Sequence, residues 1–511
     1  MKTLEELRAQ VDKADRELLA AFERRLSAVK EIGELKKREG KPVIDPGREQ
    51  EKLAQLEKEA GFESAPYVRR LYKEIMDISK DLESKPMFGV LGKHLPHTYS
   101  PEIHSMICTD YAYTVLEREE DELASLWEEG RRGVYGGFNV TIPYKRNAYG
   151  LCDELTDNAR DTGAVNTVVF REDGKSIGAN TDVFGFKYML QNSRIDPSGK
   201  KVLILGTGGA AAAVKTALMQ MNAGDIVFVS RTGDIDYTNV YDVCADAQII
   251  VNCTPAGMYP GINDCPVDIS RFKNLQAVAD IIYNPSVTRL LYDAQGLGIK
   301  TAGGLDMLVA QAFMSAALFC GASDEKEAEQ SIDPDEVGRV ALKLSKKMKN
   351  VTVIGMPGSG KTWLAKVLSD HLNRELVDLD HVYTATYGKT PAQTVTEEGE
   401  EIFREREIKI AEEQLSRSGL VISCGGGIVV RKENFFPLRC NSTVFYNERP
   451  LEVLSMNNRP ISVAKGAKTL FEERKESYES LADHVISVGA MDTREEYLEE
   501  AVKKFDEAFG S

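Results

Sequence analysis

The sequence has few of the features that mark membrane, metal-binding or disulfide-rich proteins. It contains no run of about 20 apolar residues, the length needed to cross a bilayer. The eight cysteines are scattered without a CxxC pair, and the six histidines include no HExxH pair. The opening residues, MKTLEELR, are too charged for a secretory signal. We therefore expect a cytoplasmic protein with no membrane span, zinc site or disulfide framework.

An excess of basic residues is also missing, since the net charge is −16. General nucleic-acid binding needs a basic face to neutralise phosphates, so we expect no nucleic-acid partner. Small anionic substrates would have to be bound by basic side chains gathered in local pockets.

The length of 511 residues suggests about three domains. The chain begins with a helical pattern, and strand-like runs then alternate with helices and Gly-rich turns in two later segments. We expect a multidomain chain in which an all-α dimerising domain precedes two α/β domains, a two-lobed one with a Rossmann lobe and one with a parallel sheet. The expected bounds are 1–85 for the helical domain, 86–321 for the first α/β domain (lobes of about 86–195 with 288–321, and about 196–287), 322–348 for a partly helical linker and 349–511 for the second α/β domain.

The helical domain is dominated by one long helix. Apolar residues recur at helical spacing over residues 4–32, and Gly40 and Pro42 end the pattern. The predicted helix of about 36 residues would be roughly 54 Å long. It cannot bury its apolar stripe against the two shorter helices predicted at Asp45–Glu59 and Tyr67–Glu83. We therefore expect a homodimer that forms through these helices.

A phosphate-binding loop opens the last segment. The strand-like run Val351–Ile354 precedes a GxxxxGK[ST] pattern that leads into a helical stretch, Trp363–Leu372. Backbone N–H groups of such a loop bind phosphate oxygens, while Lys361 would neutralise the β- and γ-phosphates of ATP and Thr362 would bind Mg²⁺. The nucleotide contacts are expected from Gly355, Gly358, Ser359, Gly360, Lys361 and Thr362.

Later motifs specify the phosphate acceptor. Asp378 and Asp380 are expected to point the same way from the end of the next strand. The segment resembles shikimate kinase over nearly its whole length, on the motifs Asp378-Leu-Asp380, Phe403-Arg-Glu-Arg406, Gly425-Gly-Gly427, Arg459-Pro460 and Arg474-x3-Tyr478. The resemblance implies that Asp378 helps to bind Mg²⁺ and that Asp380 contacts the hydroxyl that is phosphorylated.

The same resemblance implies how the acceptor is bound. Arg404 and Arg474 would bind its carboxylate, with the Gly426–Gly427 backbone beneath its ring, and Arg459 would reach the transferred phosphoryl group. The family usually has a further arginine that stacks on adenine shortly before the Arg-Pro pair, and residues 451–458 contain none. The missing arginine bears on the affinity for the nucleotide and not on the type of reaction.

The middle segment contains a second candidate phosphate loop. Gly206-Thr-Gly208-Gly209 follows the strand-like run Val202–Leu205 and opens an Ala-rich helix, as in a Rossmann fold. Ser230-Arg231-Thr232 ends the next strand, where an arginine favours the 2′-phosphate of NADP over NAD. Asp234 and Asp236 lie nearby and weaken that preference.

Motifs around this loop resemble shikimate dehydrogenase from about Met87 to Gly321. They are Thr98-Tyr-Ser100-Pro, Asn139-Val-Thr141-Ile-Pro-Tyr-Lys145, Gly163-Ala-Val-Asn166, Asn180-Thr181-Asp182, Asn252-Cys-Thr254-Pro-Ala-Gly, Tyr283-Asn-Pro and Gly304-Leu-Asp-Met-Leu-Val-Ala-Gln311. The resemblance implies that Lys145 and Asp182 form the catalytic pair, which delivers a proton to a ketone oxygen as hydride arrives at carbon.

The resemblance also implies contacts with the substrate and with the NADP cofactor. The implied substrate contacts are Thr98, Ser100, Asn139, Thr141, Asn166, Thr181, Tyr283 and Gln311. The implied NADP contacts are Gly206, Gly208, Gly209, Ser230, Arg231, Thr232, Thr254 and Gly304. Thr98 stands where the family commonly has Ser, so tolerance for quinate stays open. The stretch between Arg231 and Ile249 is shorter than is usual in the family. The binding of the adenosine end of the cofactor is what this difference affects.

Basic residues lie within the apolar stripe of the long helix. Arg25 and Lys36 are 11 residues apart, about three turns, so they project from one face, where cations are costly unless an anion binds. Periodicity alone is equally compatible with a coiled coil used only to dimerise. The segment 1–84 resembles the all-helical chorismate mutase family, on Leu7-Arg8, Glu23-Arg-Arg25, Lys36 and Asp45-Pro-Gly-Arg48-Glu49.

That resemblance implies an intertwined dimer in which Arg8 reaches the partner's site. The implied site residues are Arg8, Arg25 and Arg48 for two carboxylates, Lys36 for the ether oxygen, Glu49 for a hydroxyl, and Glu83. Glu83 stands where the family often has Gln, and a carboxyl donates to an ether oxygen only when it is protonated. We therefore expect mutase activity to fall as pH rises.

The whole sequence predicts a three-enzyme fusion. It would convert chorismate to prephenate, reduce 3-dehydroshikimate to shikimate with NADPH, and phosphorylate shikimate with ATP and Mg²⁺. Two alternatives stay open. The helical arm could serve only in dimerisation or effector sensing, and the kinase segment could be a degenerate nucleotide-sensing module.

Overall fold

The computed structural model describes residues 4–38, 46–61, 64–96, 98–454, 466–489 and 493–510. Within these ranges the chain divides into two compact units. Unit 1 comprises Met1–Asn180 and Ser315–Ser331, and unit 2 comprises Thr181–Met314 and Ile332–Ser511. Among the helices of the described ranges, none combines the length and apolar character that a membrane crossing requires.

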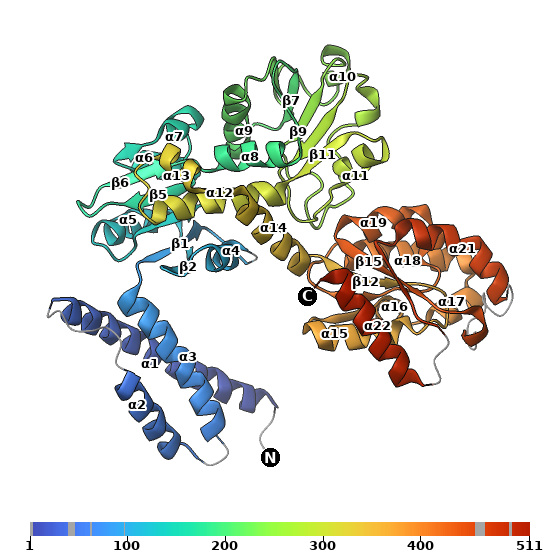
Figure 1. Ribbon diagram of the computed structural model, residues 1–511, viewed down its shortest axis with the longest axis horizontal. Helices are drawn as coiled ribbons and strands as arrows, with labels where there is room; N and C mark the ends of the chain where they lie inside the picture. The colour runs from blue at the N-terminus through green and yellow to red at the C-terminus, as the bar shows by residue number, and fades with distance from the viewer. Residues whose placement is uncertain are drawn as a thin grey trace. The chain divides into compact units, whose positions relative to one another are not determined.

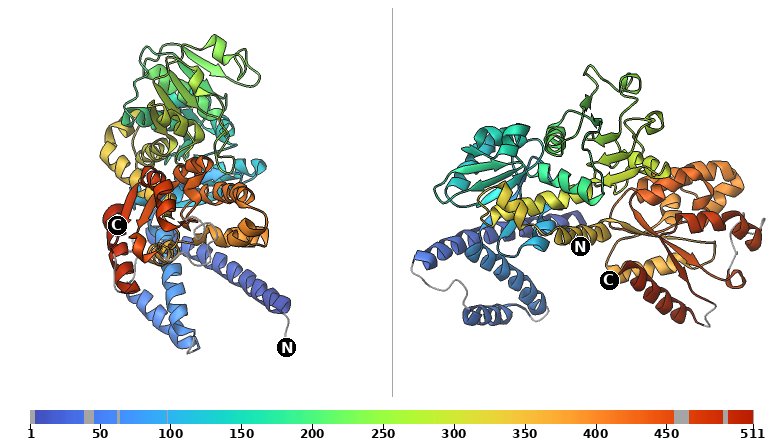
Figure 2. Two further views of the ribbon diagram at one scale, coloured as in Figure 1. Left: turned by 90° about the vertical axis from the view of Figure 1, so that its right-hand side faces the viewer. Right: turned by 45° about the horizontal axis from the view of Figure 1, so that its top comes forward.

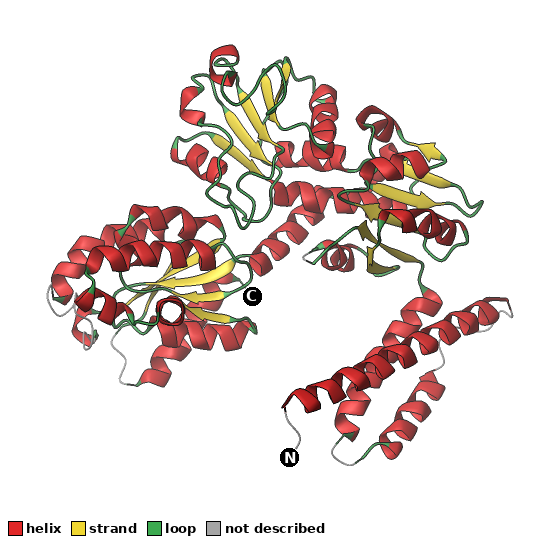
Figure 3. Cartoon of the chain, turned by 180° about the vertical axis from the view of Figure 1, so that it is seen from behind, coloured by secondary structure: helices red, strands yellow, loops and turns green. Residues whose placement is uncertain are grey.

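The N-terminal part of unit 1 is helical throughout its described residues, as Figure 3 shows. Its elements are α1 (Leu4–Arg38), α2 (Pro46–Glu59) and α3 (Ala65–Ser84). The predicted long helix is confirmed, since α1 runs for 35 residues without a break (Figure 2). Both α1 and α2 pack on α3, and Val29 and Met76 are buried.

Much of the apolar stripe of α1 stays exposed in the single chain. Val11, Leu18 and Leu19 are 59%, 56% and 57% exposed, and Tyr67 on α3 is 73% exposed. Burying such side chains contributes about 1.5–3 kcal/mol each, so this face favours a further packing partner.

The rest of unit 1 is built on a six-stranded sheet of order β2-β1-β3-β5-β6-β4. Strand β5 runs antiparallel to β3 and β6, whereas the other pairs are parallel. The strands are β1 (Met87–Gly92), β2 (Ala112–Glu117), β3 (Gly137–Val140), β4 (Glu154–Leu155), β5 (Thr167–Phe170) and β6 (Ser176–Ala179). The helices are α4 (Ser100–Ile107), α5 (Leu123–Arg131), α6 (Lys145–Leu151), α7 (Asp157–Thr162) and α13 (Glu325–Ser331).

Unit 2 begins with a parallel five-stranded sheet of order β11-β10-β9-β7-β8. Apolar clusters cover both faces of the sheet, which is why its strands read as continuous apolar runs. Figure 1 shows this sheet with helices on both of its sides. The strands are β7 (Val202–Leu205), β8 (Ile226–Val229), β9 (Ile249–Asn252), β10 (Ala277–Asp280) and β11 (Lys300–Gly303). The helices are α8 (Asp182–Asn192), α9 (Gly209–Gln220), α10 (Val240–Val243), α11 (Arg289–Gly296) and α12 (Gly304–Phe319).

A second parallel sheet follows, of order β13-β14-β12-β15-β16. The strands are β12 (Asn350–Ile354), β13 (Leu376–Asp378), β14 (Val421–Ser423), β15 (Ser442–Glu448) and β16 (His484–Ser487). The helices are α15 (Lys361–Leu372), α16 (Leu379–Tyr387), α17 (Pro391–Glu397), α18 (Glu400–Leu415), α19 (Phe435–Cys440), α21 (Ala467–Leu481) and α22 (Arg494–Phe509). The strand-like run Val351–Ile354 predicted before the phosphate loop is confirmed as part of β12.

The charged stretch before β12 is more ordered than a partly helical linker. It forms most of α13 and the 15-residue α14 (Pro334–Met348), which Asp333 caps by accepting from the Asp335 N–H. Val337 and Leu344 of α14 are fully buried, so this helix packs into the fold.

The arrangement expected for the two carboxylates after β13 needs one correction. Asp378 is the last residue of β13, but Asp380 lies in the first turn of α16. The helix begins early because the Asp378 carboxylate accepts the His381 N–H at 3.1 Å and so caps it.

Candidate active sites

The phosphate loop joins β12 to α15 in unit 2. Gly355, Gly358 and Gly360 have φ of 149°, 81° and 88°, a region that side chains rarely allow. A Cβ on Gly355 would lie 2.7 Å from the carbonyl oxygen of Asn447 in β15. The buried ammonium of Lys361 donates to a carbonyl of the same loop at 2.9 Å. The loop therefore has the tight, glycine-dependent conformation that presents backbone N–H groups to phosphate.

Three oxygen-bearing side chains meet beside this loop. The Thr362 Oγ1 donates to Asp378 Oδ2 at 3.0 Å and lies 3.2 Å from the Oγ of Ser423 at the end of β14. Hydroxyl and carboxylate oxygens are the ligands that Mg²⁺ prefers. The arrangement suits the metal role predicted for Thr362 and Asp378. Ser423 is a further candidate that the sequence did not reveal.

The glycine turn after β14 is surrounded by charged side chains. A Cβ on Gly425 would lie 3.0 Å from Asp380 Oδ1, and a Cβ on Gly427 would collide with the guanidinium of Arg404. Arg404 Nη1 donates to Glu407 Oε2 at 2.6 Å and to the Gly427 carbonyl at 3.2 Å. Burial raises the pKa of Glu407, against the effect of Arg404. The side chains that would hold the acceptor thus approach this turn closely, and a side chain at 425 or 427 would displace them.

Arg474 from α21 reaches the same turn. Its Nη1 donates to the Gly426 carbonyl at 2.9 Å, and Tyr478 donates to that carbonyl as well. The Nε atoms of Arg404 and Arg474 are buried without a hydrogen-bond partner. Two buried guanidinium groups with donor capacity left over, on adjacent glycines, form a site suited to a small carboxylate.

One signal in the sequence bears on the residues around these arginines. Glu407 follows Arg404 by one helical turn, so its pairing could have been inferred from the i,i+3 spacing in α18. Arg459 lies outside the described residues.

The dinucleotide-type loop joins β7 to α9. Gly206 has φ of 100°, and a Cβ there would lie 3.0 Å from Thr254 Cγ2, so the two predicted cofactor residues are neighbours. Gly208 caps α9 and Gly209 is its first residue, which leaves the helix N-terminus open to an anion. Arg231 is exposed in the turn after β8.

Of the two acidic residues near Arg231, Asp236 is held by hydrogen bonds within its own turn. Asp236 accepts hydrogen bonds from the N–H and hydroxyl of Thr238 and from the Asn239 N–H, which lower its pKa. Its carboxylate is therefore engaged within its own turn, and Arg231 stays suited to a 2′-phosphate.

A buried carboxylate that the sequence did not single out supports the same lobe. Asp280 at the end of β10 accepts from Asn252 Nδ2 at 3.1 Å and from Thr288 Oγ1 at 2.7 Å. Asn252 Oδ1 in turn accepts from the Thr254 hydroxyl at 2.7 Å. Burial raises the pKa of Asp280 to about 6. This chain of hydrogen bonds fixes the orientation of Thr254.

In unit 1 several predicted substrate residues surround the end of β3. Asn139 Nδ2 donates to Ser315 Oγ at 2.7 Å, and its Oδ1 accepts from the Tyr113 hydroxyl at 2.6 Å. Thr141 follows β3 directly, and Lys145 is the first residue of α6. The remaining predicted residues in this unit are Thr98 and Ser100, whose hydroxyls are 3.3 Å apart, and the buried Asn166.

Unit 2 contains the other predicted dehydrogenase residues. Asp182 is the first residue of α8 and is 8% exposed. Thr181 Oγ1 donates to Gln311 Oε1 at 3.4 Å. Burial raises the pKa of Tyr283, and a Cβ on Gly304 would collide with the Ile281 carbonyl, so the chain is tightly packed where β11 meets α12.

A pocket of ≈ 250 Å³ lies among α1, α2 and α3. Its lining includes the four predicted residues Arg25, Lys36, Arg48 and Glu49, and also Val29, Ile32, Lys52, Met76, Ser79 and Lys80. The Arg25 guanidinium donates to the Ser79 hydroxyl. Lys80 lies 2.8 Å from Glu49, and that hydrogen bond raises the pKa of Lys80. The excess of cations over carboxylates makes the pocket suited to an anion.

Two predicted residues are not placed in this pocket. Arg8 is exposed and is not among the lining residues, so its predicted role stays a prediction. The side chain of Glu83 lies outside the described residues. Ser79, one turn before Glu83, is the residue that sequence reasoning missed.

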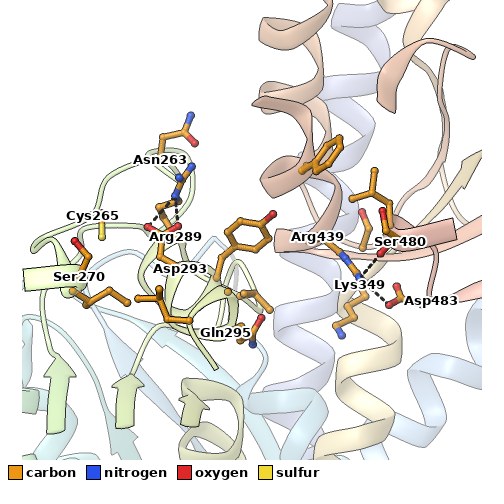
Figure 4. Close-up of a pocket in the computed structure, with 18 of the residues that line it drawn as sticks. Asn263, Cys265, Ser270, Arg289, Asp293, Gln295, Lys349, Arg439, Ser480 and Asp483 are labelled. Carbon is orange, nitrogen blue, oxygen red and sulfur yellow. Dashed lines mark hydrogen bonds and ion pairs between the residues drawn. The ribbon is translucent and has the colours of Figure 1, made fainter. Parts of the chain in front are cut away.

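Unit 2 has a further hollow of ≈ 1380 Å³ whose lining is shown in Figure 4. Its arginines are already paired, Arg289 with Asp293 at 2.9 Å and Arg439 with Asp483 at 2.7 Å. None of the predicted site residues lines it. It is therefore separate from the three candidate sites.

Three family models match separate parts of the chain. Chorismate mutase type II matches residues 7–84, the shikimate dehydrogenase substrate binding domain matches 90–168, and shikimate kinase matches 357–506.

Individual proteins match the middle of the chain. A shikimate dehydrogenase (NADP(+)) from Clostridium beijerinckii is 37% identical over 248 residues, covering 45% of this chain and 91% of its own length. One from Caldicellulosiruptor bescii is 37% identical over 251 residues, covering 44% and 85%. Among solved structures, a chorismate mutase/shikimate 5-dehydrogenase fusion protein from Clostridium acetobutylicum matches with 33% identity and a TM-score of 0.47, covering 51% of this chain and 97% of that one.

Proposed function

The chain belongs to the shikimate dehydrogenase family and also carries chorismate mutase and shikimate kinase domains, and we propose that all three are active. It is a multifunctional enzyme of the shikimate pathway. We assign it the rearrangement of chorismate to prephenate, the reduction of 3-dehydroshikimate by NADPH, and the phosphorylation of shikimate by ATP. The observation that carries the proposal is that basic side chains gather in a pocket of the helical domain and around the glycine turn of the kinase domain, which supports anion binding at both.

In the kinase domain the chemistry needs positioning and charge stabilisation rather than a covalent intermediate. Asp380 would hold the acceptor hydroxyl, and Arg404 and Arg474 would fix the acceptor's carboxylate, so the hydroxyl faces the phosphate loop. Lys361 would stabilise the charge that develops on the transferred phosphoryl group. We also assign Arg459 to that charge, on the family resemblance.

The residues beside the phosphate loop fit a magnesium ion. Thr362 and Asp378 supply one hydroxyl and one carboxylate within 3.0 Å of each other, and Ser423 adds a second hydroxyl. When bound, the ion would neutralise part of the phosphate charge of ATP. The side chains keep these oxygens together and oriented.

In the dehydrogenase domain, Lys145 and Asp182 are assigned to the proton that reaches the ketone oxygen. An ammonium beside a carboxylate can deliver a proton and regain it from solvent. Asn139 is held in one orientation by Tyr113 and Ser315, which suits it for binding a substrate hydroxyl. NADPH, which supplies the hydride, would bind at Gly206–Gly209 with its 2′-phosphate on Arg231.

In the mutase domain the reaction is a unimolecular rearrangement that needs no nucleophile. Arg25 and Arg48 would hold two carboxylates of the substrate in the reactive geometry, and Lys36 would donate to the ether oxygen as its bond breaks. Ser79 orients Arg25, because it accepts from that guanidinium and donates to the Ile75 carbonyl at 2.6 Å.

The mutase also requires a second copy of the chain. The apolar stripe of α1 is exposed, and Arg8 lies on that helix away from its own pocket. A homodimer through α1 would bury the stripe and could bring Arg8 into the partner's pocket.

We assign domain bounds of 1–85, 86–321 and 349–511, and a cytoplasmic location.

Three separate assays test the proposal with the full-length protein. Chorismate should be converted to prephenate, 3-dehydroshikimate should oxidise NADPH, and shikimate with ATP and Mg²⁺ should give shikimate 3-phosphate. Absence of prephenate formation alone would favour a helical arm that only dimerises or senses an effector. Nucleotide binding without phosphorylation would favour a sensing module in place of the kinase.

A further inference from the structure

Two thiols that are far apart in the sequence meet in unit 1. Cys108 ends helix α4, and Cys320 directly follows helix α12. Their Sγ atoms are 3.7 Å apart, although 212 residues separate them in the chain. Cys320 is exposed and Cys108 is partly exposed, so small thiol reagents can reach the pair.

The pair lies at the outer end of a contact chain that leads to the proposed substrate pocket. Cys108 packs against an aromatic cluster that includes Tyr111 and Phe319. The Tyr111 hydroxyl is 2.6 Å from Nδ1 of His104, whose ring stacks on Tyr113 at 4.0 Å between centroids. Tyr113 donates to Asn139 Oδ1 at 2.6 Å. A movement of Cys108 would therefore be transmitted through packed rings to Asn139.

Helix α4 provides a second, shorter connection. It has only eight residues, from Ser100 to Ile107, so the proposed substrate residue Ser100 and the thiol of Cys108 sit at opposite ends of one short rigid element. Tilting the helix at one end displaces the other.

The two sulfurs differ in their surroundings. The Asp110 N–H donates to the Cys108 sulfur at 3.4 Å. Burial and the neighbouring Cys108 raise the pKa of Cys320 to about 12. Cys108 is therefore the thiol that attacks first, and Cys320 is the one that resolves a mixed disulfide.

We propose that Cys108 and Cys320 are a modification site at which a reversible disulfide forms with a small-molecule disulfide, such as oxidised glutathione, as oxidant. The Cys108 thiolate attacks one sulfur of glutathione disulfide and releases one glutathione. Cys320 then loses its proton to solvent and attacks the Cys108 sulfur, which breaks the mixed disulfide and releases the second glutathione. Two protein thiols are oxidised, and one disulfide is reduced to two thiols.

Formation of this bond changes the dehydrogenase and leaves the kinase unchanged. The sulfurs must close from 3.7 Å to about 2.05 Å, which draws the end of α4 towards Cys320. The hydroxyls of Thr98 and Ser100 are thereby displaced, so the KM for 3-dehydroshikimate rises by roughly threefold or more. The phosphate loop and the Arg404 site belong to unit 2, which contains neither thiol.

The test uses the full-length protein equilibrated with glutathione and glutathione disulfide at different ratios. Remaining thiols are alkylated and counted by mass, and the linked peptides are sequenced. The expected result is loss of two of the eight thiols, mapped to Cys108 and Cys320, with recovery on reduction. Cys320→Ser should lose only the Cys108 thiol, as a mixed disulfide with glutathione, and Cys108→Ser should prevent the loss altogether. Cys265→Ser should not, since Cys265 is exposed but donates to the Val267 carbonyl at 3.3 Å.

Dehydrogenase activity of the fully reduced samples reports whether unit 1 of each variant is folded, and kinase activity does so for unit 2. Retention of all eight thiols in wild type, or a disulfide mapped elsewhere, would overturn the proposal. So would a Cys108–Cys320 disulfide that leaves the KM for 3-dehydroshikimate unchanged. The mass readout does not depend on any enzymatic activity, so failure of the assigned reactions would be recognised separately.

Discussion

The kinase site and the mutase pocket would hold the same chemical group, a carboxylate, with the same side chain, arginine, yet they are built differently. In the kinase, Arg404 and Arg474 are 3% and 5% exposed and are fixed by backbone carbonyls of one glycine turn. In the mutase pocket, Arg25 is only partly buried, Arg48 is exposed, and the apolar face of α1 has no cover. The kinase residues thus lie inside one unit, whereas we propose that a second copy of the chain completes the mutase pocket.

The difference reflects how much surface each domain can bury. A five-stranded sheet with helices on both faces encloses its own site, while three helices of which one has 35 residues leave a face exposed. The comparison yields predictions for both regions, and the effects range from loss of a reaction to a small change in KM.

The largest effect is expected at the phosphate loop. Lys361→Met should lower kinase turnover by roughly 10²–10³-fold, because it removes a buried cation placed for the phosphoryl group. Shikimate 3-phosphate formation measures it, and Lys366→Met on the exposed side of α15 is the matched control. Mutase and dehydrogenase rates should not change. If the Lys361 variant kept its kinase turnover, residues other than Lys361 would stabilise the transferred phosphoryl group.

Complementation tests whether the mutase site is shared between copies. Arg8→Ala and Arg25→Ala should each abolish prephenate formation. After unfolding and refolding together, about half of the dimers are mixed, and each mixed dimer regains one of its two sites. About one quarter of the wild-type activity should therefore return. If no activity returned, Arg8 would belong to the pocket of its own chain. The mutase site, like the kinase site, would then lie within one chain.

Ion pairs in the two regions should differ in their contribution to stability. Glu407→Gln removes a carboxylate that is buried against Arg404, so it should lower the free energy of unfolding by about 2 kcal/mol. Glu57→Gln breaks the pair with Arg69, whose side chain is 63% exposed, and should change it by less than about 1 kcal/mol. Urea unfolding followed in each domain measures both. If both variants lost the same free energy of unfolding, burial would not determine how much these ion pairs stabilise the protein.

The smallest effect is expected for a residue that only orients another. Ser79→Ala removes the hydroxyl that accepts from Arg25 and should raise the KM for chorismate by roughly three- to tenfold. Restoration by Ser79→Thr, which keeps a hydroxyl, would support an orienting role. A loss of turnover without a change in KM would contradict it.

Much of the secondary structure could be predicted from the sequence, because it depends on local sequence patterns. The long helix, the strands β7, β8, β9, β12 and β14, and the conformation of the glycine-rich loops all follow from periodicity and glycine placement. The early start of α16 was missed, since the cap at Asp378 competes with extension of the strand. The order of α13 and α14 was underestimated, because their burial depends on the fold around them.

The supporting residues of the sites could not be predicted in the same way. Ser423, Asp280 and Ser79 become informative only when the fold brings them to Thr362, Asn252 and Arg25. Each is an ordinary polar residue at the end of a strand or on a helix face, with no motif of its own. Tertiary contact, rather than local pattern, gives them a role.

One coupled reaction tests the central claim that this chain contains consecutive, working enzymes. Purified full-length protein is mixed with 3-dehydroshikimate, NADPH, ATP and Mg²⁺, and NADPH oxidation, ADP and shikimate 3-phosphate are followed together. One ADP and one shikimate 3-phosphate should form for each NADPH oxidised, with shikimate as the intermediate. NADPH oxidation without ADP, or no oxidation at all, would contradict the account.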